Sequence, residues 1–192
     1  MHHVDSRIEG YAAWWLLSVF ALLIIAFAVA LVLVPNQPKP LNKHLGQSVP
    51  TLALPVIALE GEPPMAIDPT RHSLLSLPRH ANDLVLLHVW ATWCSLCRHE
   101  HSTWLEIKAQ YPGLFIAGLV LSDTPSAVRD YLQHHASPYD ELLDDQRAEL
   151  AQALGVLATP ETFLIKGRTI VAHHYGGLTQ EAWQRKFLEF MP

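Results

Sequence analysis

An uncharged apolar block near the N-terminus divides this chain into two parts. In residues 11–34, 23 of the 24 positions are apolar, and Ser18 is the exception. A helix of this length extends about 36 Å, which covers the ~30 Å hydrocarbon core of a bilayer. The run is longer than the apolar region of a cleaved signal peptide, and its small-residue triplet 26–28 lies inside it rather than after it. We therefore expect residues 11–34 to form an uncleaved transmembrane helix that follows a short tail, residues 1–10.

The rest of the chain has the composition and size of one globular domain. Outside the apolar block, 73 of 168 residues are apolar, which is ordinary for a globular fold and too many for a disordered segment. The net charge of −5 lacks the basic excess of nucleic-acid-binding proteins, so we expect no nucleic-acid partner. Frequent prolines indicate a stiff linker over residues 35–50. We expect a single domain over residues 51–192.

Hydrophobic patterning and turn residues predict alternating strands and helices in this domain. The expected strands cover residues 51–59, 84–89, 114–121, 162–165 and 169–175. The expected helices cover residues 95–111, 124–134, 148–154 and 179–190. Thr124-Pro125 and Thr179 are suitable helix starts. The first half of this order predicts a parallel βαβ unit, and the end predicts an antiparallel hairpin followed by a helix.

The only two cysteines, Cys94 and Cys97, follow one of these strands and open a helix. Residues three apart at a helix start have Cα atoms about 5–6 Å apart, which fits a disulfide. The helix dipole and the free N–H groups favour a thiolate on the first cysteine. We expect Cys94 to be the exposed nucleophile and Cys97 to be the more buried thiol that resolves a mixed disulfide. Apart from this redox pair, the sequence predicts no cofactor.

Three other interpretations of the cysteine pair are weaker. A structural zinc site needs two further ligands, and His101 is the one nearby candidate. Haem attachment requires Cys-x-x-Cys-His, but Arg98 occupies the histidine position. An inert structural disulfide is possible, although a bond that closes so small a loop stabilises little.

Two segments carry a family resemblance. Residues 89–101 contain the cysteine pair, and residues 155–165 read Gly-Val-Leu-Ala-Thr-Pro-Glu-Thr-Phe-Leu-Ile. Together they resemble the CcmG/DsbE family of membrane-anchored, thioredoxin-like reductants of cytochrome c maturation. Shorter likenesses occur at residues 137–139 and 176–178. The resemblance covers roughly residues 48–190 and implies an α/β thioredoxin-like fold, in which a central mixed sheet is flanked by helices.

The resemblance also implies a substrate-binding surface beside the cysteines. Pro160 would be a cis-proline that faces the disulfide, since X-Pro bonds alone adopt cis at low cost. The backbone of Thr159 could then pair with an extended peptide. Glu161 would recognise a partner, with an ordinary surface position as the alternative. Trp93 would pack beside the cysteines and contact substrate, with simple core packing as the alternative.

Two further residues are candidates for proton transfer. The resemblance implies that Glu100, one helical turn after Cys97, lies near the cysteines and relays protons to them. A solvated helix glutamate is the alternative. His88 stands six residues before Cys94, where the family often has asparagine. It could relay protons, or it could be a hydrogen-bonded core histidine.

Two other groups of residues, one of histidines and one of acidic residues, give weaker indications of function. Histidines at positions 99, 101, 134, 135, 173 and 174 form no recognised ligand set, so we expect most of them at the surface and no metal. The acidic positions 140, 141, 144 and 145 suggest a solvated loop, with an acidic face for basic partners as the alternative.

The resemblance implies a thiol–disulfide oxidoreductase on the periplasmic side of the bacterial inner membrane. It would reduce the disulfide of apocytochrome c before haem attachment, beside other maturation proteins, and a DsbD/CcdA-type membrane protein would supply its electrons. Because Cys-x-x-Cys helices serve reductants and oxidants alike, the direction follows from the resemblance alone. One alternative is a TlpA/ResA-like reductant of other substrates, such as oxidase assembly factors. Another is a non-catalytic module that binds apocytochrome or haem.

Overall fold

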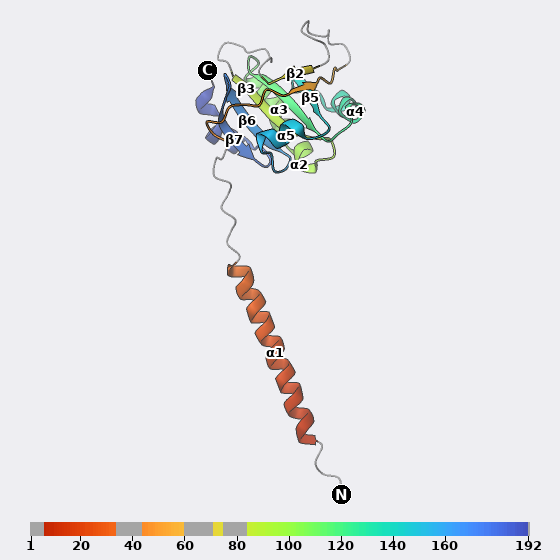
Figure 1. Cartoon of the computed structure of the whole chain (residues 1–192), viewed down its shortest axis with the longest axis vertical. Helices are drawn as coiled ribbons and strands as arrows, with labels where there is room; N and C mark the ends of the chain where they lie inside the picture. The colour runs from red at the N-terminus through yellow and green to blue at the C-terminus, as the bar shows by residue number, and fades with distance from the viewer. Residues whose placement is uncertain (1–5, 34–43, 60–70, 75–83, 192) are drawn as a thin grey trace. The chain divides into compact units, whose positions relative to one another are not determined.

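The structure, a computed structural model, describes residues 6–33, 44–59, 71–74 and 84–191. The chain forms two compact units, Met1–Lys43 and His44–Pro192 (Figure 1). Residues 35–43, the greater part of the predicted linker, and residue 34, the last of the predicted anchor, lie outside the described residues.

The first unit contains one helix, α1 (Ser6–Leu33). It begins five residues before the apolar block, so part of the predicted tail is helical. The polar exception Ser18 donates its hydroxyl to the Trp14 carbonyl oxygen at 2.8 Å, which satisfies this side chain within the helix. Among the described residues, no helix reaches the length and apolar content required to cross a membrane. Membrane crossing by residues 11–34 therefore stays a prediction.

The second unit is built on a mixed five-stranded sheet of order β5-β4-β3-β6-β7 (Figure 1). Strands β3, β4 and β5 are parallel, whereas β6 is antiparallel to both β3 and β7. The strands are β3 (Leu84–Trp90), β4 (Phe115–Leu121), β5 (Glu141–Asp145), β6 (Glu161–Lys166) and β7 (Thr169–Tyr175). A separate antiparallel pair joins β1 (Ala53–Pro55) and β2 (Arg71–Ser73). This sheet confirms the predicted α/β thioredoxin-like fold.

Strand β5 corrects the prediction of a solvated acidic loop. Leu142 and Leu143 are both buried, because a parallel strand beside β4 is covered on both faces. The buried Asp145 carboxylate accepts hydrogen bonds from three backbone N–H groups at the start of the next helix. Glu141 is also buried and lies 2.7 Å from His72 Nδ1. Asp145 and Glu141 are thus buried with partners inside the fold, and only part of the acidic run reaches solvent.

The helices agree with the prediction except at two points. They are α2 (Ser95–His99), α3 (His101–Gln110), α4 (Pro125–His135), α5 (Glu149–Leu154) and α6 (Gln180–Lys186), followed by a 3-10 turn (Leu188–Phe190). The hydroxyls of Thr124 and Thr179 accept the expected N-cap hydrogen bonds. The helix predicted over residues 95–111 is divided at Glu100, which ends α2 and precedes α3. The helix predicted to reach residue 190 ends at Lys186.

Each face of the sheet carries its own core. Even-numbered residues of β3, from Leu84 to Trp90, point to the face that α3, α4 and α6 cover. Odd-numbered residues, such as Val85 and Leu87, point to the opposite face, which α5 covers. The sheet therefore separates His88, on the first face, from side chains on the second.

The start of the domain lies earlier than predicted. Gly46 N donates to Ile170 O, and Ile170 N donates to Gln47 O, so residues 46–49 pair along the free edge of β7. Val49 is buried in the second core. The end of the predicted linker is thus part of the folded domain, because an unpaired sheet edge offers its backbone groups to a neighbouring segment.

Candidate active site

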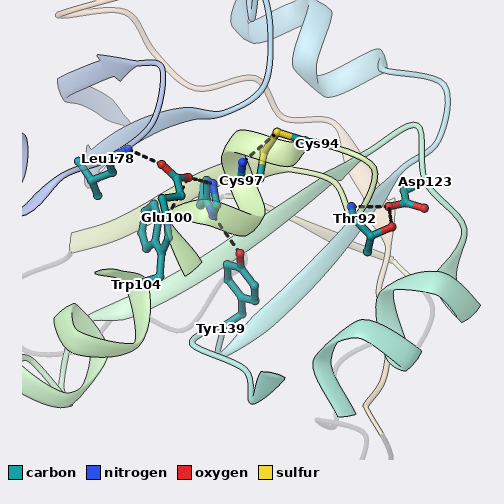
Figure 2. Close-up of a disulfide and its surroundings, with 9 residues drawn as sticks. Thr92, Cys94, Cys97, Glu100, Trp104, Asp123, Tyr139 and Leu178 are labelled. Carbon is teal, nitrogen blue, oxygen red and sulfur yellow. Dashed lines mark hydrogen bonds and ion pairs between the residues drawn. A yellow bond between two sulfur atoms is a disulfide. The ribbon is translucent and has the colours of Figure 1, made fainter. Parts of the chain in front are cut away.

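The cysteine pair stands at the N-terminus of α2, just beyond the end of β3 (Figure 2). Cys94 is the N-cap residue, and its Sγ accepts a hydrogen bond from Cys97 N at 3.1 Å. The two residues form a disulfide, and their Cα atoms are 5.3 Å apart, as the spacing predicts. An electron-accepting disulfide is thus held where helix N–H groups stabilise a thiolate after reduction.

The exposure of Cys94 differs from the prediction. Cys94 is only 6% exposed and Cys97 is 2% exposed. Cys94 remains the more accessible of the two, as expected, but in the disulfide state it is buried rather than exposed. The physical reason is that each bonded sulfur covers part of the other, and the first turn of α2 covers Cys94 Sγ from one side.

The Asp123 carboxylate, which the sequence did not indicate as part of the site, fixes the turn before the cysteines through hydrogen bonds. Asp123 Oδ2 accepts hydrogen bonds from both N and Oγ1 of Thr92, each at 2.7 Å, as Figure 2 shows. Asp123 Oδ1 accepts a third from Thr124 N at 2.7 Å. This carboxylate fixes the cysteine turn to the segment between β4 and α4. No spacing in the sequence relates positions 92 and 123, because they meet only through the parallel pairing of β3 and β4.

Glu100 is buried, which excludes the alternative of a solvated helix glutamate. Its Oε1 lies 2.8 Å from His88 Nε2 and accepts a hydrogen bond from Trp104 Nε1 at 3.1 Å. Its Oε2 accepts a hydrogen bond from Leu178 N (Figure 2). One carboxylate, a helical turn after Cys97, thus connects β3, α3 and the segment that follows β7.

His88 is held on both of its ring nitrogens. While Nε2 faces Glu100, Nδ1 lies 2.9 Å from Tyr139 Oη, and the ring stacks on Trp104 with centroids 4.2 Å apart. Burial raises the pKa of Tyr139 well above its ordinary value, and the charge of Glu100 raises it further. Tyr139 therefore keeps its proton at neutral pH, and its hydroxyl stays within hydrogen-bond distance of His88 Nδ1. Both alternatives for His88, core histidine and proton relay, fit this geometry.

The loop before β6 reaches the same end of the sheet as the cysteines. The Thr159–Pro160 peptide bond is cis, as predicted. Glu161 pairs with Val89 in register, so Pro160 lies beside the C-terminal end of β3, from which the cysteine turn departs. Pro160 O accepts a hydrogen bond from Gly176 N at 3.0 Å, which joins this loop to the segment after β7. Peptide binding at Thr159 stays a prediction.

Glu161 does not have the surface role that we considered. It is 0% exposed, so its carboxylate cannot meet a partner directly. Its Oε1 accepts hydrogen bonds from Leu157 N at 2.7 Å and Ala158 N at 3.2 Å. Its Oε2 lies 2.9 Å from His173 Nε2. Because backbone N–H groups need acceptors inside a protein, this side chain supports the cis-proline loop from within.

Three large apolar side chains are exposed, two of them next to the cysteines in the chain and one in the cis-proline loop. Trp93 is 57% exposed, so the alternative of simple core packing is wrong, and its Nε1 donates to Ser122 O at 3.2 Å. Leu96, between the cysteines, is 45% exposed, and Leu157, in the cis-proline loop, is 69% exposed. We call these three residues the apolar rim. Contact between these side chains and a substrate stays a prediction.

The histidines divide between surface and interior. His99, His134 and His135 are exposed, as expected. His101 and His173 are buried, which corrects the expectation for both. His101 Nε2 donates toward the carbonyl oxygens of His135 and Ala136, each at 3.1 Å. Burial lowers the pKa of His101, although these two carbonyl contacts act in the opposite direction.

Comparison with known proteins gives four findings. Residues 45–174 match the AhpC/TSA family. A thiol:disulfide interchange protein DsbE from Yersinia pestis is 34% identical over 90% of this chain and 87% of that protein. A DsbE homolog from Paracoccus denitrificans is 38% identical over 54% of this chain, but the match spans only 56% of the Paracoccus protein. The crystal structure of a secreted thiol-disulfide isomerase from Corynebacterium glutamicum matches with a TM-score of 0.60 and 20% identity, over 79% of this chain and 94% of that one.

Proposed function

This chain belongs to the AhpC/TSA family and, within it, to the DsbE thiol:disulfide interchange proteins, and we propose that it reduces the disulfide of apocytochrome c before haem is attached. Its thiol–disulfide oxidoreductase chemistry follows from the family and from the cysteine pair. The direction, the substrate and the cellular location are the parts that we propose.

One observation carries the proposal. The Cys94–Cys97 disulfide stands at a helix start, with the exposed Trp93 and Leu96 next to the cysteines in the chain and the buried Glu100 one helical turn after Cys97. The Cys-x-x-Cys-His segment of an unfolded apocytochrome is an extended, accessible peptide, which suits a surface formed by Trp93 and a proline-flanked loop. For this reaction, the described residues need to supply only two thiols, those of Cys94 and Cys97, and a route for protons.

The reaction is a two-step exchange. The Cys94 thiolate attacks one sulfur of the substrate disulfide, so that a mixed disulfide forms and the other substrate sulfur leaves as a thiolate and takes up a proton. Cys97 then loses its proton and attacks Cys94 Sγ. The second substrate sulfur leaves as a thiol, and the Cys94–Cys97 disulfide forms. Two electrons pass to the substrate, and a DsbD/CcdA-type membrane protein returns two electrons to the pair.

Glu100 would handle the proton that the second step requires. Its carboxylate lies one helical turn after Cys97 and is held by His88, Trp104 and the backbone of Leu178. A buried carboxylate can accept the Cys97 proton, and the His88 imidazole beside it can share the charge that results. In this role Glu100 is the proton acceptor, and His88 orients it.

The proposed location is the periplasmic side of the bacterial inner membrane. The uncharged run over residues 11–34 supports a single-pass anchor, and the helical conformation of α1 is compatible with it. A dedicated reductant is needed where disulfides form spontaneously, which supports an orientation with residues 44–191 in the periplasm. The anchor would keep the redox pair close to a membrane-bound electron donor.

Trapping of the mixed disulfide tests the substrate. In Cys97→Ala the first step proceeds but the second cannot, so we expect a covalent complex between Cys94 and apocytochrome c in cells that mature cytochrome c. The complex should be seen by non-reducing electrophoresis and identified by mass spectrometry. The matched control, Cys94→Ser with Cys97 retained, should trap nothing and should abolish maturation.

Each other outcome points to a different function. Capture of a copper-site or oxidase assembly subunit instead of apocytochrome c would favour the TlpA/ResA-like alternative. Full cytochrome c maturation by Cys94→Ser would contradict catalysis and favour a binding module.

A further inference from the structure

On the face of the sheet opposite His88, three buried side chains from separate segments converge. They are His44, at the start of the domain, Glu161, at the start of β6, and His173, in β7. Each offers a metal-ligating atom, and these atoms all lie within 4.8 Å of one another. We propose that His44, Glu161 and His173 form a binding site for a divalent transition-metal cation, for which Zn²⁺ is the probe.

The pairing of β6 with β7 brings two of the ligands together. His173 pairs with Phe163, two residues along β6 from Glu161, so the side chains of His173 and Glu161 are diagonal neighbours on one face. Glu161 Oε2 and His173 Nε2 are 2.9 Å apart. The other oxygen, Oε1, is engaged by Leu157 N and Ala158 N, which fixes the carboxylate with Oε2 directed to the histidine. Such outer hydrogen bonds orient the ligands of metal sites.

The third ligand comes from the segment that pairs along β7. The His44 ring lies edge-on to the His173 ring, with centroids 4.7 Å apart. Gly155 leaves room for it, since a Cβ at that position would lie 2.9 Å from His44 Cε1. A side chain there would displace the imidazole from the cluster. The backbone of Gly155, the C-cap residue of α5, and the ring of His44 are therefore fitted to each other.

The chemistry of the donors selects the cation. Two imidazoles and one carboxylate suit Zn²⁺ and its neighbours, whereas Ca²⁺ and Mg²⁺ prefer oxygen ligands alone. All three residues are at least nine-tenths buried, and Phe163 forms an apolar wall against both imidazoles. Ligands at about 2.1 Å around a tetrahedral zinc lie about 3.4 Å from one another. The ligand atoms, which lie within 4.8 Å of one another, would approach this spacing by rotation of the side chains around the cation.

The site would act on the loop that carries Pro160. Glu161 follows Pro160 directly and holds Leu157 and Ala158 through Oε1. A cation bound at Oε2 would join this loop to β7 and to the start of the domain through one centre. We expect it to stabilise the fold around the cis-proline without any part in electron transfer.

Equilibrium dialysis against Zn²⁺ tests the site in the full-length protein in detergent. The protein is kept oxidised, because reduced Cys94 and Cys97 bind zinc themselves, and absence of free thiols is verified. We expect one zinc per oxidised chain and a higher unfolding temperature in its presence. Co²⁺ in place of Zn²⁺ should give visible ligand-field absorption without a thiolate charge-transfer band.

Matched variants separate a metal site from a plain hydrogen bond. Glu161→Gln keeps an acceptor for the loop and a donor for His173 but removes the charge, and His44→Gln removes one imidazole. Both should fold and lose the zinc, while His134→Gln, on the exposed surface of α4, should keep it. Oxidised wild-type protein without zinc above background, or zinc retained by both site variants, would overturn the proposal. Binding only after reduction would assign the metal to the cysteines and overturn it as well.

Discussion

Glu100 joins the helix of the cysteines to three other parts of the fold through a single carboxylate. The sequence predicts its place one turn after Cys97, and its spacing of four residues from Trp104 is also visible there. The sequence does not show its contacts with His88 and Leu178. They depend on the packing of α3 against β3 and on where the chain passes after β7. Helical periodicity relates close neighbours in sequence, whereas tertiary packing relates positions 88, 100 and 178.

Substitutions of His88 test whether this residue transfers protons or only makes a structural hydrogen bond. His88→Leu leaves Glu100 and Tyr139 without this partner, so we expect the free energy of unfolding to fall by about 1–3 kcal/mol. His88→Gln can donate to Glu100 and restore most of that stability, but it cannot take up a proton. If His88 takes part in proton transfer, His88→Gln should still reduce substrate at least about 10-fold more slowly than wild type.

The measurement pairs urea unfolding with the single-turnover rate of mixed-disulfide resolution, followed across pH. Tyr139→Phe serves as the control, because it removes one hydrogen bond to His88 and no titrating group near neutral pH. Wild-type rates in a stable His88→Gln variant would show that the histidine is structural only.

At the scale of elements, β5 is the part of the sheet that the sequence did not indicate. Four acidic positions in six residues are typical of a solvated loop, and no local pattern shows that two leucines between them are buried on opposite faces. The strand is stabilised by pairing with β4 and by its cap on α5. Strands and helices whose stability comes from a neighbouring element are the hardest to predict from local sequence patterns.

Gly118, in β4, is closely surrounded by side chains from β3, β5 and the segment before β5, and this packing gives a prediction. A Cβ there would lie 2.7 Å from Leu142 Cδ2, 2.8 Å from Trp90 Nε1 and 3.1 Å from Tyr139 Cδ1. Gly118→Ala should therefore lower the free energy of unfolding by about 1–3 kcal/mol, as overpacking does, and displace Tyr139. Urea denaturation measures the loss.

Gly113→Ala provides the matched control, since a Cβ at Gly113 meets nothing within 4 Å. We expect its unfolding midpoint to stay near that of wild type. Equal stability of the two variants would mean that the sheet relaxes around Gly118 without cost.

For the whole molecule, we expect the buried His101 to make stability depend on pH. Burial holds the pKa of His101 below its ordinary value of 6.5, so the unfolded chain binds a proton there more readily than the folded one. The stability that this residue contributes is present above pH 6.5 and is lost as the pH falls below 6.5 toward the folded pKa. The oxidised domain should therefore unfold at lower urea concentration at pH 5.5 than at pH 7.5.

His101→Gln tests the source of this dependence, because glutamine can donate to the carbonyls of His135 and Ala136 without titrating. We expect the difference between the two urea midpoints to shrink in this variant. The exposed His134→Gln should leave the difference unchanged. An undiminished difference in His101→Gln would assign the dependence to other groups.

The sequence by itself determined the parts of this protein that depend on neighbours along the chain. The apolar run, the cysteine pair at a helix start, the cis position of Pro160 and the mixed α/β order follow from periodicity, spacing and two motif segments. Only the tertiary structure decided which side chains meet: Asp123 with Thr92, Tyr139 with His88, and Glu161 with His173 and His44. The physical reason is that strand register and helix packing bring together residues tens of positions apart, and burial then determines whether a charged side chain faces solvent or a partner.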